Sequence, residues 1–302
     1  MTYTRGRTYI KRVNAQVDGT VLELPGGPLK MAVGVDYFWM KNKNGQIRGP
    51  VGNLTGVYPH RVRDVKSVFA EVVVPIFGTN NAFPFFQSLE LNLAGRIDEY
   101  SDVGSTTNPK FGFNWRPVED IKIHGSYGES FRAPLLTDIS DGSGRILYIQ
   151  NYFDPTVGAT IQGVAIGGGR PGLRPETART YSLGVDYTPS AMPGVRLSLN
   201  YFDIVYQNQI DSYLANLSLL RQEAVFSSII LRGAAAQARI AQFVNQGLLV
   251  NGGSTATALS SNVFIDGLPG NLGTTITRGV DFGIGFPVRT GNAGEFRASL
   301  NG

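Results

Sequence analysis

Residues 89–134 read LELNLAGRIDEYSDVGSTTNPKFGFNWRPVEDIKIHGSYGESFRAP, and this stretch decides how the rest of the sequence is interpreted. Apolar residues occupy alternate positions in three runs, which begin at Leu89, Phe111 and Ile121. Successive side chains of a β-strand point to opposite faces, so each run predicts a strand with one apolar and one polar face. The residues PVED at 117–120 are typical of a tight turn. The stretch therefore predicts consecutive antiparallel strands.

The same alternation recurs along the whole chain. It predicts about ten strands, at 16–24, 31–39, 68–76, 89–98, 111–116, 121–127, 180–187, 195–201, 279–286 and 294–302. Several of them carry Tyr, Trp or Phe near the end of the apolar face, where a membrane barrel places its interfacial aromatic residues. A soluble sandwich would alternate in the same way, so alternation alone does not separate the two.

The connections between these strands distinguish a membrane barrel from a soluble sandwich better than alternation does. Short connections lie at 25–28, 117–120, 189–194 and 289–294, a medium one at 77–87, and longer ones at 44–61, 101–108, 132–174 and 208–273. Since the short ones alternate with the long ones, all short turns should fall at one end of the sheet. This asymmetry is typical of outer-membrane barrels, which have short periplasmic turns and long extracellular loops. Within the last loop, 218–247 is rich in Ala, Leu and Ile and predicts one or two short helices.

Composition excludes several classes of protein. Charged residues make up 17% of the chain, below the roughly 25% of soluble domains, and 38 residues are glycine. Without cysteine there is no disulfide framework and no thiolate metal site. The net charge of +4 is scattered and forms no basic block, which argues against a nucleic-acid partner. No apolar run is long enough for a membrane-spanning helix, but strands that alternate need none.

No catalytic constellation is evident. The two histidines, His60 and His124, are too few for a zinc site, and His124 lies on the polar face of a strand. A pair of His124 and Ser126 raises the idea of an esterase, but no G-x-S-x-G elbow is present. We therefore predict no enzyme activity, no metal and no cofactor. The candidates for contact with a substrate are three arginines near the predicted loop ends, namely Arg132, Arg170 and Arg174.

Several stretches, taken in order, resemble TonB-dependent outer-membrane receptors. The most specific is 89–134, with the R-x-x-x-Y-S strand end, the G-S-T-x-x-P-K turn, the W-R-P turn and the S-F-R-A-P strand end. The others are DGTVLELPGGPLKMAVGVDYF at 18–38, VFAEVVVPIFG at 68–78, GLRPETARTYSLGVDYTP at 172–189 and NLGTTITRGVDFGIGF at 271–286.

The resemblance implies an all-β fold, an antiparallel transmembrane β-barrel fragment with about ten strands of a 22-stranded barrel. It implies that 1–302 is the central part of the barrel domain, with long loops at 132–174 and 208–273, and that the plug and the C-terminal strands are absent. The export signal would then lie upstream, since the N-terminus has no apolar signal region. An open piece of barrel wall would leave two unpaired edges, so we do not expect it to function alone.

The function that the resemblance implies is import across the outer membrane of a gram-negative bacterium. The ligand would be scarce, such as a siderophore, a vitamin or an oligosaccharide, and the partners would be outer-membrane lipid and the TonB complex, which acts through the plug. Two alternatives stay open. A passive porin-like barrel would share the alternation and the loop asymmetry but lack the ordered motifs at 89–134, and a soluble β-sandwich binding module would share only the alternation.

Overall fold

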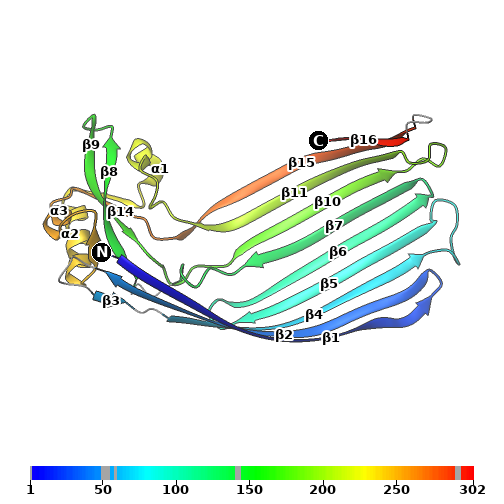
Figure 1. Ribbon diagram of the computed structural model, residues 1–302, viewed down its shortest axis with the longest axis horizontal. Coiled ribbons are helices and arrows are strands. Elements are labelled where there is room, and N and C mark those ends of the chain that lie inside the picture. Colours follow the sequence, from blue (N-terminus) through cyan, green and yellow to red (C-terminus); the bar gives the residue numbers. More distant parts are fainter. Residues whose placement is uncertain (1, 49–54, 58–59, 140–143, 290–293) are drawn as a thin grey trace.

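The computed structural model describes residues 2–48, 55–57, 60–139, 144–289 and 294–302. Most of the chain forms one antiparallel sheet, whose strands lie side by side in the order β1-β2-β4-β5-β6-β7-β10-β11-β15-β16, with β3 paired to β2 (Figure 1). The strands are β1 (Thr2–Leu24), β2 (Gly27–Arg48), β3 (Thr55–Val57), β4 (His60–Phe77), β5 (Ser88–Tyr100), β6 (Gly104–Val118), β7 (Ile121–Arg132), β10 (Glu176–Tyr187), β11 (Arg196–Asp211), β15 (Gly270–Arg289) and β16 (Glu295–Asn301).

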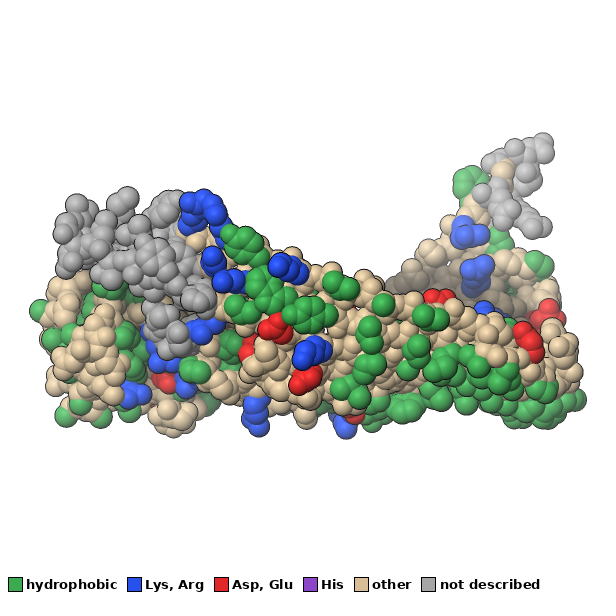
Figure 2. Space-filling view, turned by 90° about the horizontal axis from the view of Figure 1, so that it is seen from below, with side chains coloured by type: hydrophobic (Ala, Val, Ile, Leu, Met, Phe, Trp, Pro, Cys, Tyr) green, Lys and Arg blue, Asp and Glu red, His purple; other side chains and the backbone are tan. Residues whose placement is uncertain are grey.

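The large sheet has one apolar face that stays exposed. Direct cross-strand partners share a face, and Val33, Val68, Leu93 and Leu199 all lie on the apolar one, where each remains exposed. Figure 2 shows hydrophobic side chains densely packed toward the right-hand end of the molecule. An exposed apolar surface of this extent on a soluble monomer is rare and marks contact with a membrane or a partner.

The opposite face is polar and cross-linked by charge. Asp36 on β2 is buried between two arginines, with Arg12 Nη2 at 2.9 Å and Arg96 Nη2 at 3.4 Å from its Oδ2 atom. The Nε atom of Arg96 also lies 2.7 Å from Asp98 Oδ1 on the same strand. This network ties β1, β2 and β5 together on the side that a closed barrel would turn toward its interior.

The connections divide between the two ends of the sheet as the sequence predicts. Connections 25–26, 78–87, 119–120 and 188–195 lie at one end, which we call the turn end, and 101–103, 133–175 and 212–269 lie at the other, the loop end. The predicted connections 44–61 and 289–294 fall partly outside the described residues. Within the described part, the bounds of 44–61 are wrong, because β2 continues to Arg48, β3 spans Thr55–Val57 and β4 begins at His60.

One predicted loop at the loop end is wrong. Residues 101–108 were expected as a long loop, but β5 continues to Tyr100 and β6 begins at Gly104. A turn of only three residues is possible because Gly104 adopts a φ of +82°, which reverses the chain without steric cost. Ser101 fastens this turn to β4, since its N–H donates to the Asp64 carbonyl and its hydroxyl accepts from the Asp64 N–H, both at 3.0 Å.

The two longest connections are not structureless. Together they form a second, mixed sheet in the order β12-β14-β9-β8-β13, which we call the loop subdomain with its helices (Figure 1). In it β14 runs parallel to β9, and β13 runs parallel to β8. Its elements are β8 (Ile146–Asp154), β9 (Ala159–Gly167), η1 (Leu219–Gln222), α1 (Glu223–Phe226), β12 (Ile230–Arg232), α2 (Gly233–Asn245), β13 (Leu249–Asn251), α3 (Thr255–Leu259) and β14 (Val263–Asp266).

The loop subdomain has its own hydrophobic core. Ala236, Ile240 and Phe243 repeat at helical spacing on one side of α2 and are buried against the sheet. The prediction of one or two short helices in 218–247 is confirmed by α1 and α2, and the 3₁₀-helix η1 precedes α1. The ends of the predicted loop 208–273 differ, because β11 continues to Asp211 and β15 begins at Gly270.

A buried ion network links two parts of this subdomain. Asp154, at the end of β8, is buried and lies 2.6 Å from Arg232 Nη1, while Arg232 Nη2 lies 2.7 Å from Glu223 Oε2. The hydrogen bond from Arg232, helped by those from Thr156, lowers the pKa of Asp154 to about 2.

Among the described residues, no helix is long and apolar enough to cross a membrane.

Candidate functional site

The β6–β7 ladder opens toward the loop end of the sheet. The two strands pair from Val118 and Ile121 up to Lys110 and Gly128, and then stop pairing. Both continue beyond that point, β6 back to Gly104 and β7 forward to Arg132. Since both strands stay extended without a shared ladder, they diverge and leave a wedge between them.

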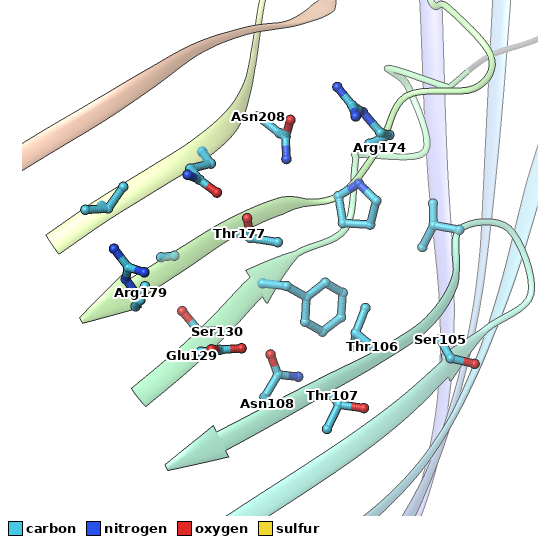
Figure 3. Close-up of a pocket in the computed structure, with 16 residues that line it drawn as sticks. Ser105, Thr106, Thr107, Asn108, Glu129, Ser130, Arg174, Thr177, Arg179 and Asn208 are labelled. Atoms are coloured by element: carbon cyan, nitrogen blue, oxygen red, sulfur yellow. The ribbon is translucent and has the colours of Figure 1, made fainter. Parts of the chain in front are cut away.

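A cavity of about 560 Å³ occupies this opening. Its walls come from β6, β7, the start of β10 and the end of β11, and polar side chains dominate them (Figure 3). The charged groups in the wall are the cations Arg174 and Arg179 and the carboxylate of Glu129. The cavity lies within the 300–1,000 Å³ range of small-molecule sites, and its excess of guanidinium groups favours a ligand with negative charge.

One wall group lacks a protein partner. The hydroxyl of Thr106 is buried, yet it finds no hydrogen-bond partner among the described residues. A buried hydroxyl without a partner costs roughly 1–3 kcal/mol unless water or a ligand satisfies it. The Thr106 hydroxyl is therefore a buried wall group whose hydrogen bonds the described residues do not supply.

The side chain of Asn271 holds the rim of the cavity in place. Its Oδ1 atom accepts from the Arg174 N–H at 2.9 Å, and its Nδ2 atom donates to the carbonyls of Arg174 at 2.9 Å and Asn208 at 2.8 Å. Asn208 has a φ of +56°, an uncommon conformation for a residue other than glycine, at a bulge in β11. The single amide thus joins the segment before β10 to the end of β11 and positions Arg174 over the opening.

The buried carboxylate of Glu176 links neighbouring strands close to the rim of the cavity. Glu176 and Arg132 face each other across β10 and β7, with Arg132 Nε 3.0 Å from Glu176 Oε2. The other oxygen, Oε1, accepts from the Ile210 N–H at 2.7 Å. Glu176 therefore connects three strands at the level where both long connections leave the sheet.

Arg170 joins the two long connections to each other. Its Nη2 atom lies 2.8 Å from Asp266 Oδ2, and its Nε atom donates to the Pro269 carbonyl at 2.8 Å. Its backbone N–H donates to the Asp138 carbonyl at 2.6 Å. The guanidinium is therefore engaged within the protein.

The three arginines expected to meet a substrate thus have different surroundings. Arg174 lines the cavity and makes no ion pair with any residue that the structure describes, whereas Arg132 and Arg170 are paired with carboxylates. Sequence reasoning missed Arg179, Glu129, Thr106 and Asn271. A signal existed for Arg179, because it follows the same alternation as the apolar residues Tyr181, Leu183 and Val185, and a charge in such a series marks the point where that face leaves lipid.

In the part of the chain that the structure describes, no group of three or more His, Cys, Asp or Glu side chains could hold a metal ion. Polar side chains and the guanidinium groups of Arg174 and Arg179 line the site.

The sequence itself matches a known family over nearly its whole length. The family described as TonB dependent receptor-like, beta-barrel matches residues 2–302. The chain belongs to this family. The expected resemblance and the expected fold class are thereby confirmed, and the long antiparallel sheet is a section of such a barrel wall.

Solved structures of receptors and transporters share the fold. The siderophore receptor PirA from Acinetobacter baumannii is 13% identical, with a TM-score of 0.59 over 94% of this chain and 35% of that one. A variant of the ferric enterobactin receptor PfeA from Pseudomonas aeruginosa, in complex with enterobactin, is 16% identical, with a TM-score of 0.60 over 95% of this chain and 34% of that one.

The RagAB peptide transporter is also similar, at 12% identity and a TM-score of 0.53, over 99% of this chain and 30% of that one. This TonB-dependent receptor-like chain therefore spans about a third of the length of these structures. No protein with a curated description matches it. The family and these neighbours are receptors and transporters rather than enzymes, and TonB-dependent receptor barrels reside in the outer membrane of gram-negative bacteria.

Proposed function

We propose that this chain forms part of the wall of an outer-membrane receptor that imports a scarce small ligand into a gram-negative bacterium. The membership of the family supports this proposal, as do the exposed apolar face and the polar opposite face of its sheet. A strand that spans a membrane must pair all its backbone groups within the protein, and a sheet that closes on itself does so. Energy for import comes from TonB, which engages the plug domain of such receptors.

The observation that carries the binding part of the proposal is the cavity between β6 and β7. It lies at the loop end, which is the extracellular end of an outer-membrane barrel. Arg174 is our candidate for direct contact with the ligand, because its guanidinium group lines the opening. Arg132 and Arg170 do not bind the ligand but hold the surrounding segments together, through ion pairs with Glu176 and Asp266.

The ligand class follows from the same groups. The guanidinium of Arg174, with the hydroxyl and amide groups of the wall, suits an anionic, oxygen-rich molecule such as a ferric siderophore. A vitamin or an oligosaccharide is the next choice. The similar structures include receptors named for siderophores and for ferric enterobactin, which agrees with the first choice.

The test is uptake of radioactive iron by cells that produce the full-length protein as their only such receptor. Cells with TonB should accumulate iron from ferric enterobactin or a related ferric siderophore, and matched cells without TonB should not. Arg174→Ala should reduce uptake at least tenfold at limiting ligand, because one charge-assisted contact contributes about 1.5–3 kcal/mol. Arg239→Ala is the control, since Arg239 lies on α2, does not line the cavity, and contacts Gln242 and the Phe243 ring of its own helix.

Equal uptake with and without TonB would instead support the passive porin-like alternative. A protein that stays monomeric in water without detergent would support the soluble sandwich. If ferric siderophores are not taken up but cyanocobalamin or a maltooligosaccharide is, the receptor function stands and the siderophore choice is wrong.

A further inference from the structure

The connection between β4 and β5 has an unusual composition for a turn. Residues 77–87 read FGTNNAFPFFQ, with four phenylalanines and no charged residue. We call this segment the aromatic turn. It lies at the turn end of the sheet, opposite the loop subdomain (Figure 1). Exposed turns in water are normally rich in polar residues, so this composition needs a physical reason.

The aromatic turn folds back onto the large sheet through its rings. Phe77, Phe83 and Phe86 surround one another with ring centroids 5.0–5.2 Å apart. Phe86 in turn lies 5.6 Å from the ring of Trp115 on β6. Edge-to-face and offset contacts at these distances are favourable beyond simple burial. The turn is therefore packed against the sheet rather than extended away from it.

The backbone of the turn leaves the rings of Phe83 and Phe85 exposed. Phe83 and Phe86 exchange backbone hydrogen bonds of 2.8 and 3.3 Å around Pro84 and Phe85. Phe85 has a φ of +68°, at the position of such a turn where glycine is usual. Its carbonyl accepts from Trp115 Nε1 at 2.9 Å. Its side chain stays 69% exposed and that of Phe83 49% exposed.

The side chain of Asn81 is satisfied within the turn. Asn81 Oδ1 accepts from the Gly78 N–H at 2.9 Å, and Asn81 Nδ2 donates to the Ile76 carbonyl at 2.9 Å. Thr79 and Asn80, at the start of the turn, are exposed. Around Phe83 and Phe85 the turn presents rings and no charge, so this part of it can leave water without burying a charged group.

The exposed rings continue the apolar face of the sheet. Trp115 belongs to a row of direct cross-strand partners that share this face, comprising Leu89, Trp115, Ile123, Val185, Leu199 and Phe282. The aromatic turn packs on this row at Trp115, next to the β5 end of the row. Whatever covers the row must therefore also meet Phe83 and Phe85.

We infer that the aromatic turn is a membrane anchor, which seats Phe83 and Phe85 in the boundary between head groups and acyl chains of the phospholipid leaflet. The inference rests on the proposed placement of the sheet in a membrane. Aromatic rings are favoured at that boundary, and every ring that leaves water there contributes hydrophobic free energy. Because the turn is packed on Trp115, the anchor also fixes the depth of β4, β5 and β6 in the bilayer.

The test uses site-directed spin labels on the full-length protein in vesicles of phosphatidylethanolamine and phosphatidylglycerol. The chain has no cysteine, so single labels can be placed at Phe85→Cys, Leu199→Cys and Val157→Cys. Collisions with oxygen report lipid, and collisions with a water-soluble nickel chelate report water. Leu199 is the control for the membrane face, at 55% exposure, and Val157 in the loop subdomain is the control for water, at 63% exposure.

The expected result is that the labels at Phe85 and Leu199 favour oxygen severalfold, and that the label at Val157 favours the nickel chelate. A label at Phe83→Cys repeats the test if the first variant fails to fold. If Leu199 reads as lipid but Phe85 and Phe83 read as water, the anchor is wrong and the membrane placement stands. If both probes are excluded from Phe85 and Phe83, protein covers the turn and the anchor is also wrong. If Leu199 reads as water, the proposed function itself fails.

Discussion

The guanidinium of Arg170 lies 2.8 Å from the carboxylate of Asp266, although 96 residues separate the two in the sequence. This ion pair joins the two long connections that form the loop subdomain. The rim of that cavity is held by a second long-range link, from Asn271 to Arg174 and Asn208. The link through Asn271 can be tested by substitution.

Removal of the Asn271 amide should loosen the rim without unfolding the sheet. Asn271→Asp keeps the acceptor for the Arg174 N–H but loses both donated hydrogen bonds, and it adds a negative charge beside the Arg174 and Asn208 carbonyls. We expect a loss of about 1–3 kcal/mol in local stability and faster hydrogen exchange at 174–178 and 205–209. Asn251→Asp, at an exposed position of β13, is the control. Equal exchange in the two variants would show that Asn271 does not hold the rim.

Truncation of a core residue should unfold the loop subdomain alone. Ile240 is fully buried in the core beside α2, so Ile240→Ala should cost about 2–5 kcal/mol. Hydrogen exchange should accelerate in β8, β9 and β14 while β5, β6 and β7 keep their protection. Val225→Ala, at a side chain that is 73% exposed, should change little. Simultaneous loss of protection in both sheets would mean that the two unfold as one unit.

Acid should weaken the loop subdomain through Asp154. The pKa of this carboxyl is lowered to about 2 from an ordinary 3.8, chiefly by its hydrogen bond from Arg232. A carboxyl with a lowered pKa in the folded state contributes stability above its unfolded pKa and loses it as the pH falls toward the folded pKa. We therefore expect a loss on the order of 1–2 kcal/mol between about pH 4 and pH 2. Hydrogen exchange in β8 and β9 across this range measures it.

The matched variant for the acid experiment is Asp154→Asn. It removes the titrating group while keeping the shape of the side chain. Its β8 and β9 peptides should be less protected at neutral pH, and the dependence of their exchange on pH between 4 and 2, after correction for intrinsic exchange, should be reduced. If the variant keeps the full dependence, another group is responsible.

The two faces of the large sheet should tolerate charge differently. Leu199 lies on the apolar face and its neighbour Asn200 on the polar one, so Leu199→Arg places a charge in lipid and Asn200→Arg does not. The first should cost up to about 2–4 kcal/mol of stability in bilayers, depending on depth, and the second under about 1 kcal/mol. Unfolding by urea in lipid vesicles compares them. Similar losses would contradict a lipid-facing surface.

Local patterning was sufficient to predict the large sheet. The strands after Met31, Leu89 and Tyr181 lie where their alternation placed them, and the sheet order follows the chain order wherever the connection is short. The errors occurred where alternation stops. The run GSTTNP at 104–109 has no apolar alternation, so its pattern predicts a loop. It nevertheless extends β6, because the turn at Gly104 places it next to β5, with which it pairs.

The candidate site was less accessible to such reasoning. Of the three arginines chosen for their place near loop ends, only Arg174 lines the cavity. Nothing near Arg132 or Arg170 in the sequence shows that Glu176 or Asp266 will pair with it across the fold. Arg179 was visible as a charge in an apolar series, whereas the role of Asn271 follows only from its distance to Arg174 and Asn208.

The sequence by itself determined the strands, their two faces and their order, because a period of two is local and each short turn forces its neighbours to pair. Only the tertiary structure decided that 133–175 and 212–269 share one sheet and core, that β6 and β7 separate above Lys110 and Gly128, and that the aromatic turn packs on Trp115. These features depend on contacts between segments far apart in the chain. Such contacts leave no periodic pattern in the sequence, because each residue has many possible partners until the chain is packed.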